Sequence, residues 1–235
     1  DAAPNPVNTI EKASMLFAGA AGWNEAKTWA EGANQRAALE ALKKVTQART
    51  IKDAYWMGQG YGAQAVTSDM VRAGVYTELG DPPLLAGAKL RYLSALERLA
   101  ILSHVEATRL AADGKPHEAI TVMTEWSMFA RQMCDRQLYR EAKWGYQQLI
   151  LGLQRVRDIA YQDYRGDRKI TPEQIVDLIR WLDDERGPML SVRLRFPEGD
   201  LIAGEQILAR TYKSTGEVDA RTFGETLSRL NATCQ

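Results

Sequence analysis

The residues of this sequence that could do acid–base or metal chemistry are few. Only two histidines occur, His104 and His117. His104-x-Glu106 lacks the one-turn spacing of an HExxH motif, and no Cys-x-x-Cys pair is present. At 1.5 Å per residue, His104 lies about 15 Å and His117 about 4 Å along their helices from a predicted turn between them. We therefore expect two packed or surface histidines, no metal site and no cofactor.

A carboxylate offers the remaining route to catalysis. A helical hydrolase can work with one buried acid and a second carboxylate nearby. Glu106 is the candidate, because it lies on an apolar-rich part of its helix, where loss of hydration raises a carboxyl pKa. The competing interpretation is a structural glutamate that is hydrogen-bonded or paired with an arginine between helices. No Gly-x-Ser-x-Gly motif supplies a serine nucleophile.

Two cysteines, Cys134 and Cys234, could form a disulfide. In the loop-entropy model, a bridge that closes a loop of about 100 residues stabilises a fold by up to about 4.7 kcal/mol. The alternative is two free thiols, one of them a small core residue in a helix. The sequence leaves both interpretations open.

Composition excludes some partners. Lysine plus arginine equals aspartate plus glutamate at 30 each, so no net charge favours nucleic acid or an anionic membrane. The longest nearly apolar run, Met15–Trp23, is far shorter than the roughly 20 residues that a transmembrane helix needs. The sequence begins Asp1-Ala2-Ala3-Pro4, as it would after removal of a signal peptide or after trimming of a longer chain. We expect a periplasmic or extracellular protein.

Helical periodicity dominates the elements that must position these residues. Two long segments with apolar residues at helical spacing flank the turn Asp113–Pro116, and a third segment covers Leu138–Tyr164. Asp81-Pro82-Pro83 predicts the start of the helix that leads into the turn. Thr171 with Gln174 forms a predicted capping box, and Asp219 is a predicted cap of the last helix.

The remaining stretches set the predicted domain organisation. Residues 1–8 contain two prolines and no periodicity, so we expect an extended N-terminal tail. Ser191–Phe196 alternates with period two and predicts an extended stretch within 188–199. We expect one all-α domain over 9–235, with a possible subdivision near residue 80. Its architecture is an irregular bundle or solenoid of packed helical hairpins, with roughly eight to ten helices.

The central hairpin carries a family resemblance. Ala107, Leu110, Ala119 and Met123 have the small, large, small, large spacing of a tetratricopeptide-like helical hairpin, which this part of the chain resembles over about one repeat. Small residues let the two helices approach, and large ones fill the groove beside them. The resemblance implies protein–protein recognition on a concave helical surface. The chain departs from the family's preferred residues at Ser103, Glu106, Trp126 and Arg131.

These observations favour a non-enzymatic interaction or assembly subunit whose partners are other protein subunits, in a homo- or hetero-oligomer. Six tryptophans and seven methionines are many for a chain of 235 residues, and both residue types are enriched at interfaces. We expect the binding surface on the N-terminal tail, on the glycine-rich stretch before Asp81 or on Ser191–Phe196. The alternative is a carboxylate-dependent hydrolase or lyase that acts on a glycan or small polar substrate in a helical cleft. A third hypothesis is a carrier of an apolar ligand between helices.

Overall fold

The computed structural model describes residues 2–47, 66–183, 189 and 197–233. These residues contain ten α-helices and almost no strand, so the predicted all-α class is confirmed. The helices form two compact units. Unit 1 comprises Asp1–Met57, Leu96–Asp135 and Lys143–Leu194, and unit 2 comprises Gly58–Ala95, Arg136–Ala142 and Arg195–Gln235. The predicted single domain over 9–235 stays a prediction.

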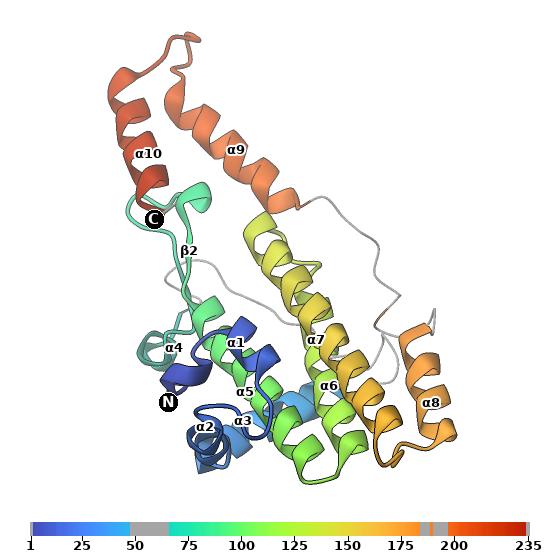
Figure 1. Ribbon diagram of the computed structural model, residues 1–235. Helices are drawn as coiled ribbons and strands as arrows, with labels where there is room; N and C mark the ends of the chain where they lie inside the picture. The colour runs from blue at the N-terminus through green and yellow to red at the C-terminus, as the bar shows by residue number, and fades with distance from the viewer. Residues whose placement is uncertain (1, 48–65, 184–188, 190–196, 234–235) are drawn as a thin grey trace. The chain divides into compact units, whose positions relative to one another are not determined.

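The predicted central hairpin contributes much of the buried core of unit 1. Helix α5 (Tyr92–Ala112) and helix α6 (Pro116–Met133) flank the turn, where Gly114 has a φ of +74° that glycine adopts without a steric penalty. Pro116 begins α6 at a position where a missing N–H costs nothing. Helix α7 (Tyr139–Arg165) lies beside α6, and α8 (Pro172–Asp183) follows it (Figure 1).

Trp126 lies at the centre of the core of unit 1 and is fully buried. Its ring meets Trp144 of α7 edge-on, with the ring centroids 6.1 Å apart. Ala107 and Ala119 are also fully buried in this cluster, as the small positions of the predicted hairpin require. The same cluster contains Leu42, Ala100, Leu110, Ile120, Met123, Val156, Ile159 and Ile170.

The N-terminal segment, which belongs to unit 1, packs against the other helices of this unit. Residues 1–8 were predicted to be extended, but Asn5–Val7 form a 3-10 helix, η1, with which the fixed φ of Pro6 is compatible. Val7 is fully buried in a second apolar cluster that includes Ile101 and Val105 of α5. The next helices of unit 1 are α1 (Ile10–Met15), α2 (Trp23–Ala30) and α3 (Ala33–Thr46).

A buried arginine of α7, Arg155, forms hydrogen bonds with the N-terminal segment at the end of α1. The Arg155 guanidinium donates hydrogen bonds to the carbonyl oxygens of Ser14 at 3.3 Å and of Leu16 at 3.1 Å. It also donates to the hydroxyl of Thr108 on α5. Three carbonyl or hydroxyl oxygens thus replace part of the hydration that the guanidinium loses on burial.

Unit 2 contains a clear difference in helix boundaries from the sequence prediction. The helix predicted to start at Asp81-Pro82-Pro83 begins only at Tyr92. Strand β1 (Thr77–Glu78) pairs antiparallel with β2 (Lys89–Leu90), so the chain is extended where a helix was expected. The Glu78 carboxylate forms ion pairs with Lys89 at 3.3 Å and with Arg91 at 3.0 Å beside this pairing. The remaining short elements are α4 (Ser68–Ala73) and the 3-10 helix η3 (Leu85–Gly87).

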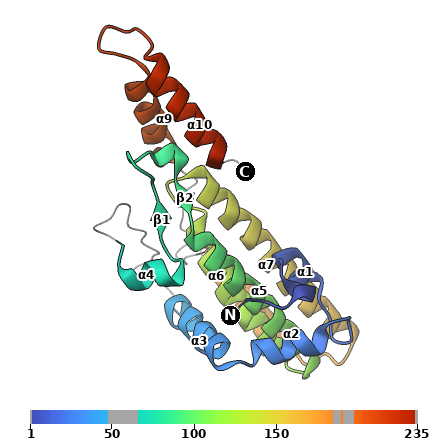
Figure 2. The same cartoon turned by 90° about the vertical axis from the view of Figure 1, so that its left-hand side faces the viewer.

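The last two helices of unit 2 form a hairpin and hold the loop between the two strands. Helices α9 (Glu198–Thr211) and α10 (Ala220–Thr233) run side by side in both views (Figure 1, Figure 2). Gln206 of α9 accepts a hydrogen bond from the Leu85 amide at 3.0 Å. Arg229 of α10 donates to the Leu79 carbonyl at 2.9 Å. Side chains of both helices thereby satisfy loop backbone groups that lack secondary-structure partners.

The predicted helix caps at Thr171 and Asp219 are confirmed. Thr171 and Gln174 exchange hydrogen bonds between backbone amides and side-chain oxygens, at 3.0 and 3.3 Å, in a capping box at the start of α8. Asp219 accepts from the amides of Arg221 and Thr222 at the start of α10.

The predicted extended stretch Ser191–Phe196 lies outside the described residues. Of the surrounding range 188–199, the structure describes residues 189 and 197–199, and the last two of these belong to α9. Among the described helices, none combines the length and the apolar character that crossing a membrane requires.

Candidate functional site

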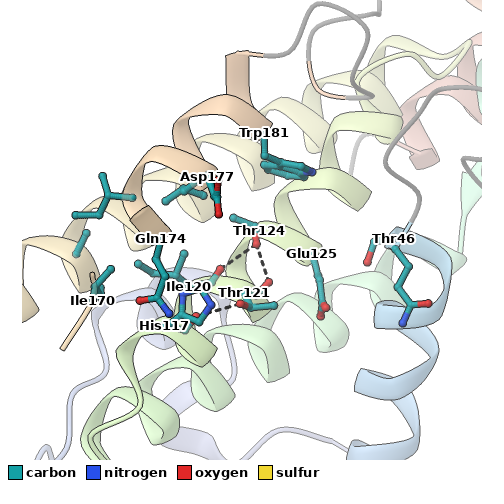
Figure 3. Close-up of a pocket in the computed structure, with 14 residues that line it drawn as sticks. Thr46, His117, Ile120, Thr121, Thr124, Glu125, Ile170, Gln174, Asp177 and Trp181 are labelled. Atoms are coloured by element: carbon teal, nitrogen blue, oxygen red, sulfur yellow. Dashed lines mark hydrogen bonds between the residues drawn. The ribbon is translucent and has the colours of Figure 1, made fainter. Parts of the chain in front are cut away.

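A cavity of about 380 Å³ opens in unit 1 between α6 and α8, with the end of α3 at one side. This volume lies within the range of small-molecule sites, roughly 300–1,000 Å³. The lining combines apolar side chains with polar groups and one indole (Figure 3). The lining residues are Thr46, Gln47, His117, Ile120, Thr121, Thr124, Glu125, Ala160, Ile170, Gln174, Ile175, Asp177, Leu178 and Trp181.

Glu125 is the half-buried acid of this pocket. Its carboxylate makes no hydrogen bond or ion pair with any residue that the structure describes. Burial raises the pKa of the Glu125 carboxyl from 4.5 to about 7, Lys43 opposes the rise and Glu40 adds to it. The group can therefore give or accept a proton near neutral pH.

The other ionisable groups of the pocket are more exposed. Asp177 lies on α8 and forms a 3.6 Å ion pair with Arg180, with both side chains about three-quarters exposed. His117, at the start of α6, is also exposed. Figure 3 shows Asp177 and Trp181 on α8, across the pocket from Thr121 and Glu125 on α6.

The raised pKa of Glu125 makes stability depend on pH. Its folded-state pKa, about 7, exceeds the ordinary value of 4.5, so its contribution to stability is complete below pH 4.5 and is lost as pH rises through 7. We expect Glu125→Gln to remove this part of the pH dependence. At pH 8 the variant should gain about 1–2 kcal/mol in free energy of unfolding, after allowance for solvent screening.

Urea denaturation of the wild type and Glu125→Gln at pH 5 and pH 8 measures this effect. Glu118→Gln, an exposed change on the same helix, is the matched control. Equal pH dependence in the wild type and Glu125→Gln would contradict the assignment.

Glu106, the acid that the sequence singled out, is fully engaged in an ion pair. Both of its carboxylate oxygens accept hydrogen bonds at 2.7 Å from Arg109, which also contacts Asp113 at 2.9 Å. The pairing with an arginine was one of the two interpretations of Glu106, but the partner lies one turn along the same helix rather than across helices. Glu106 is not among the residues that line the cavity.

The two histidines have different surroundings. His104 is fully buried, and neither ring nitrogen has a hydrogen-bond partner among the residues that the structure describes. Burial lowers the pKa of His104 to about 3, with a further contribution from Arg155, so the ring stays neutral. His117 lines the cavity. No group of three or more His, Cys, Asp or Glu side chains among the described residues is arranged to hold a metal ion.

Cys134 follows α6 and is buried. Its thiol donates to the Ala130 carbonyl at 3.4 Å, and burial raises the pKa of the thiol to about 11. Cys234 lies outside the described residues. The disulfide between them stays a prediction.

A second candidate site is the surface of the α9–α10 hairpin in unit 2. Only small or hydroxylated residues of this hairpin are buried in the part of the chain that the structure describes: Gly199, Ala203, Thr211 and Thr226. Its seven large apolar side chains that face solvent are each at least 41% exposed: Leu201, Ile202, Leu208, Tyr212, Val218, Phe223 and Leu227. We call these seven residues the hairpin surface.

Neither site was predicted from the sequence. His117, Thr121, Thr124 and Glu125 recur at helical spacing, which was a signal of a polar stripe on α6, but such a stripe also fits a solvated face. Nothing local indicates that α8 lies across it. The apolar residues of α9 and α10 fit an ordinary packed helix equally well, because periodicity does not say whether a partner covers the face.

Comparison with known proteins gives no relative. No protein-family model matches the chain, and neither the curated proteins nor the solved structures contain a significant match.

Proposed function

We propose that this chain is a non-enzymatic interaction or assembly subunit that binds another protein through the hairpin surface. The supporting observation is that this hairpin exposes seven large apolar side chains and fully buries only small or hydroxylated residues. Large contiguous apolar patches on soluble proteins mark interaction sites.

The geometry of the hairpin suits a docking role. Leu201 and Leu208 are seven residues apart on α9, so they lie on one face of the helix. Phe223 and Leu227 are four apart on α10 and also share a face. At the tip, Tyr212 pairs with Val218 in an isolated antiparallel bridge, and Asp219 donates its amide to the Thr211 carbonyl at 2.7 Å. These bonds close the loop between α9 and α10 and link the two helices that carry the hairpin surface.

The hairpin surface is a different location from the three segments on which the sequence led us to expect binding. The N-terminal tail packs against its own unit, and the Ser191–Phe196 stretch and most of the glycine-rich stretch before Asp81 lie outside the described residues. The partner, another protein subunit with an apolar face, follows from the chemistry of the hairpin surface.

Removal of the hairpin's apolar groups tests this function. We expect the double variant Leu201→Ser, Leu208→Ser to weaken association at least tenfold, because each leucine lost from the centre of an interface costs about 1–3 kcal/mol. Light scattering over a concentration series measures self-association. Isolation of tagged chains from the native source, followed by titration of the purified partner, measures hetero-association.

The control is Ile150→Ser, which makes the same kind of change at an exposed apolar position of α7, and should associate as the wild type does. Far-ultraviolet circular dichroism establishes that each variant keeps its helices. A wild-type chain that stays monomeric at about 100 µM, where even weak interfaces form, and that carries no partner from its source would contradict the proposal.

A further inference from the structure

Three threonine hydroxyls that line the α6–α8 cavity are free to accept hydrogen bonds from a ligand. Thr121 donates its hydroxyl proton to the His117 carbonyl at 3.0 Å, and Thr124 donates to the carbonyls of Ile120 and Thr121 (Figure 3). Thr46 likewise donates to the Leu42 carbonyl at 2.9 Å. Each of these three hydroxyls already donates its proton to a helix carbonyl, so its oxygen can only accept a hydrogen bond from a ligand.

The charged groups of the cavity also favour a ligand that donates hydrogen bonds. Glu125 and Asp177 are both lining residues, and the Glu125 carboxylate has no partner among the described residues. No lysine or arginine lies among the described residues that line the cavity. A ligand that donates hydrogen bonds and carries a positive charge would satisfy the carboxylate and hydroxyl oxygens together.

The α8 side of the cavity lacks contacts that a ligand could supply. This helix has no fully buried side chain, although it is amphipathic. Ile175, Leu178 and Trp181 of α8 line the cavity opposite Ile120 of α6. An apolar group placed between these faces would bury surface that α8 leaves uncovered, and the Trp181 ring can attract a nearby cation.

We propose that this cavity binds a primary organic ammonium ion with an apolar body. The Glu125 carboxylate forms the ion pair, and the threonine hydroxyls accept the remaining ammonium protons. The apolar body lies between Ile120 and the α8 side chains Leu178 and Trp181. This binding activity is independent of the hairpin surface, which belongs to unit 2.

Several titratable and charged groups set the pH dependence of binding. Around Glu125 these are Lys43 and Glu40 on α3, His117 on α6, and Asp177 with its partner Arg180 on α8. The ion pair needs an ionised Glu125, whose pKa of about 7 leaves it largely protonated at pH 6. Affinity should therefore rise about tenfold between pH 6 and pH 8, because ionised Glu125 is the minority form one pH unit below its pKa.

Isothermal titration calorimetry with three phenyl-containing probes of similar size tests the proposal. The probes are 2-phenylethylammonium, neutral 2-phenylethanol and anionic 3-phenylpropionate. The full chain should bind the ammonium ion at pH 8 and bind the other two at least about tenfold more weakly, as expected for a charge-assisted hydrogen bond. Glu125→Gln keeps the shape of the side chain and should weaken ammonium binding about tenfold.

Trp181→Leu should weaken ammonium binding about fivefold through loss of the indole face. Glu118→Gln, on the same helix but outside the cavity, should bind as the wild type does. Thermal unfolding of each variant shows that the fold is kept. Absence of ammonium binding at millimolar concentration, equal binding of the three probes, or undiminished binding by Glu125→Gln would each overturn the proposal.

Discussion

Replacement of Glu141 by alanine should lower the free energy of unfolding by about 3–5 kcal/mol, as expected when one partner of a buried ion pair is lost. Glu141 is fully buried in unit 2. Its carboxylate accepts hydrogen bonds from the Tyr92 hydroxyl, from Arg136 Nε at 3.2 Å and from the Leu138 amide at 3.2 Å. Alanine would leave a guanidinium and a phenol in a buried site with fewer acceptors.

Urea denaturation followed by far-ultraviolet circular dichroism measures this loss. Glu118→Ala is the matched control, since the Glu118–Lys115 pair is 3.5 Å apart and both side chains are more than half exposed. Such surface pairs contribute less than about 1 kcal/mol. Equal losses for the two variants would show that the Glu141 network does not stabilise the fold.

The second large effect is expected at Gly145, where α7 meets α6. A Cβ atom at Gly145 would lie 2.6 Å from the Met133 carbonyl carbon and 2.7 Å from the Cys134 amide nitrogen. Both are backbone atoms, so no side-chain rotation can relieve the clash and the helices must separate. We expect Gly145→Ala to destabilise the protein by about 2–3 kcal/mol, the cost typical of overpacking a core.

The same substitution at Gly224 should have the opposite sign. A Cβ at this position of α10 meets nothing within 4 Å in the described part of the chain. Alanine there should stabilise the helix by about 0.5–1 kcal/mol, because glycine has a low helix propensity. Parallel urea denaturation of both variants checks the contrast, and a loss at Gly224 as large as at Gly145 would contradict the steric explanation.

Local signals made most of the helices predictable. The turn at Gly114, the capping box of Thr171 with Gln174, and the Asp219 cap each depend on residues within a few positions of one another. The apolar spacing of α5 and α6 also predicted that these two helices are buried on more than one side. The helix starts at Thr171 and Asp219 were predicted correctly from such local caps, whereas the local start signal at Asp81 was not followed by a helix.

The features that the sequence did not predict depend on distant residues. Tyr92 begins α5 because Thr77 and Glu78 pair with Lys89 and Leu90, and no local pattern encodes that pairing. The candidate pocket was missed for the same reason. Glu125 looks like any surface glutamate until α8, about 50 residues later in the sequence, comes to lie across α6.

The division into two units has a spectroscopic consequence. All five tryptophans in the described part of the chain, Trp23, Trp29, Trp126, Trp144 and Trp181, belong to unit 1. Tryptophan emission therefore follows the unfolding of unit 1, whereas circular dichroism follows the helices of both units. Coincident transitions by the two signals would mean that the units unfold as one cooperative system, and separate transitions would give each unit its own stability.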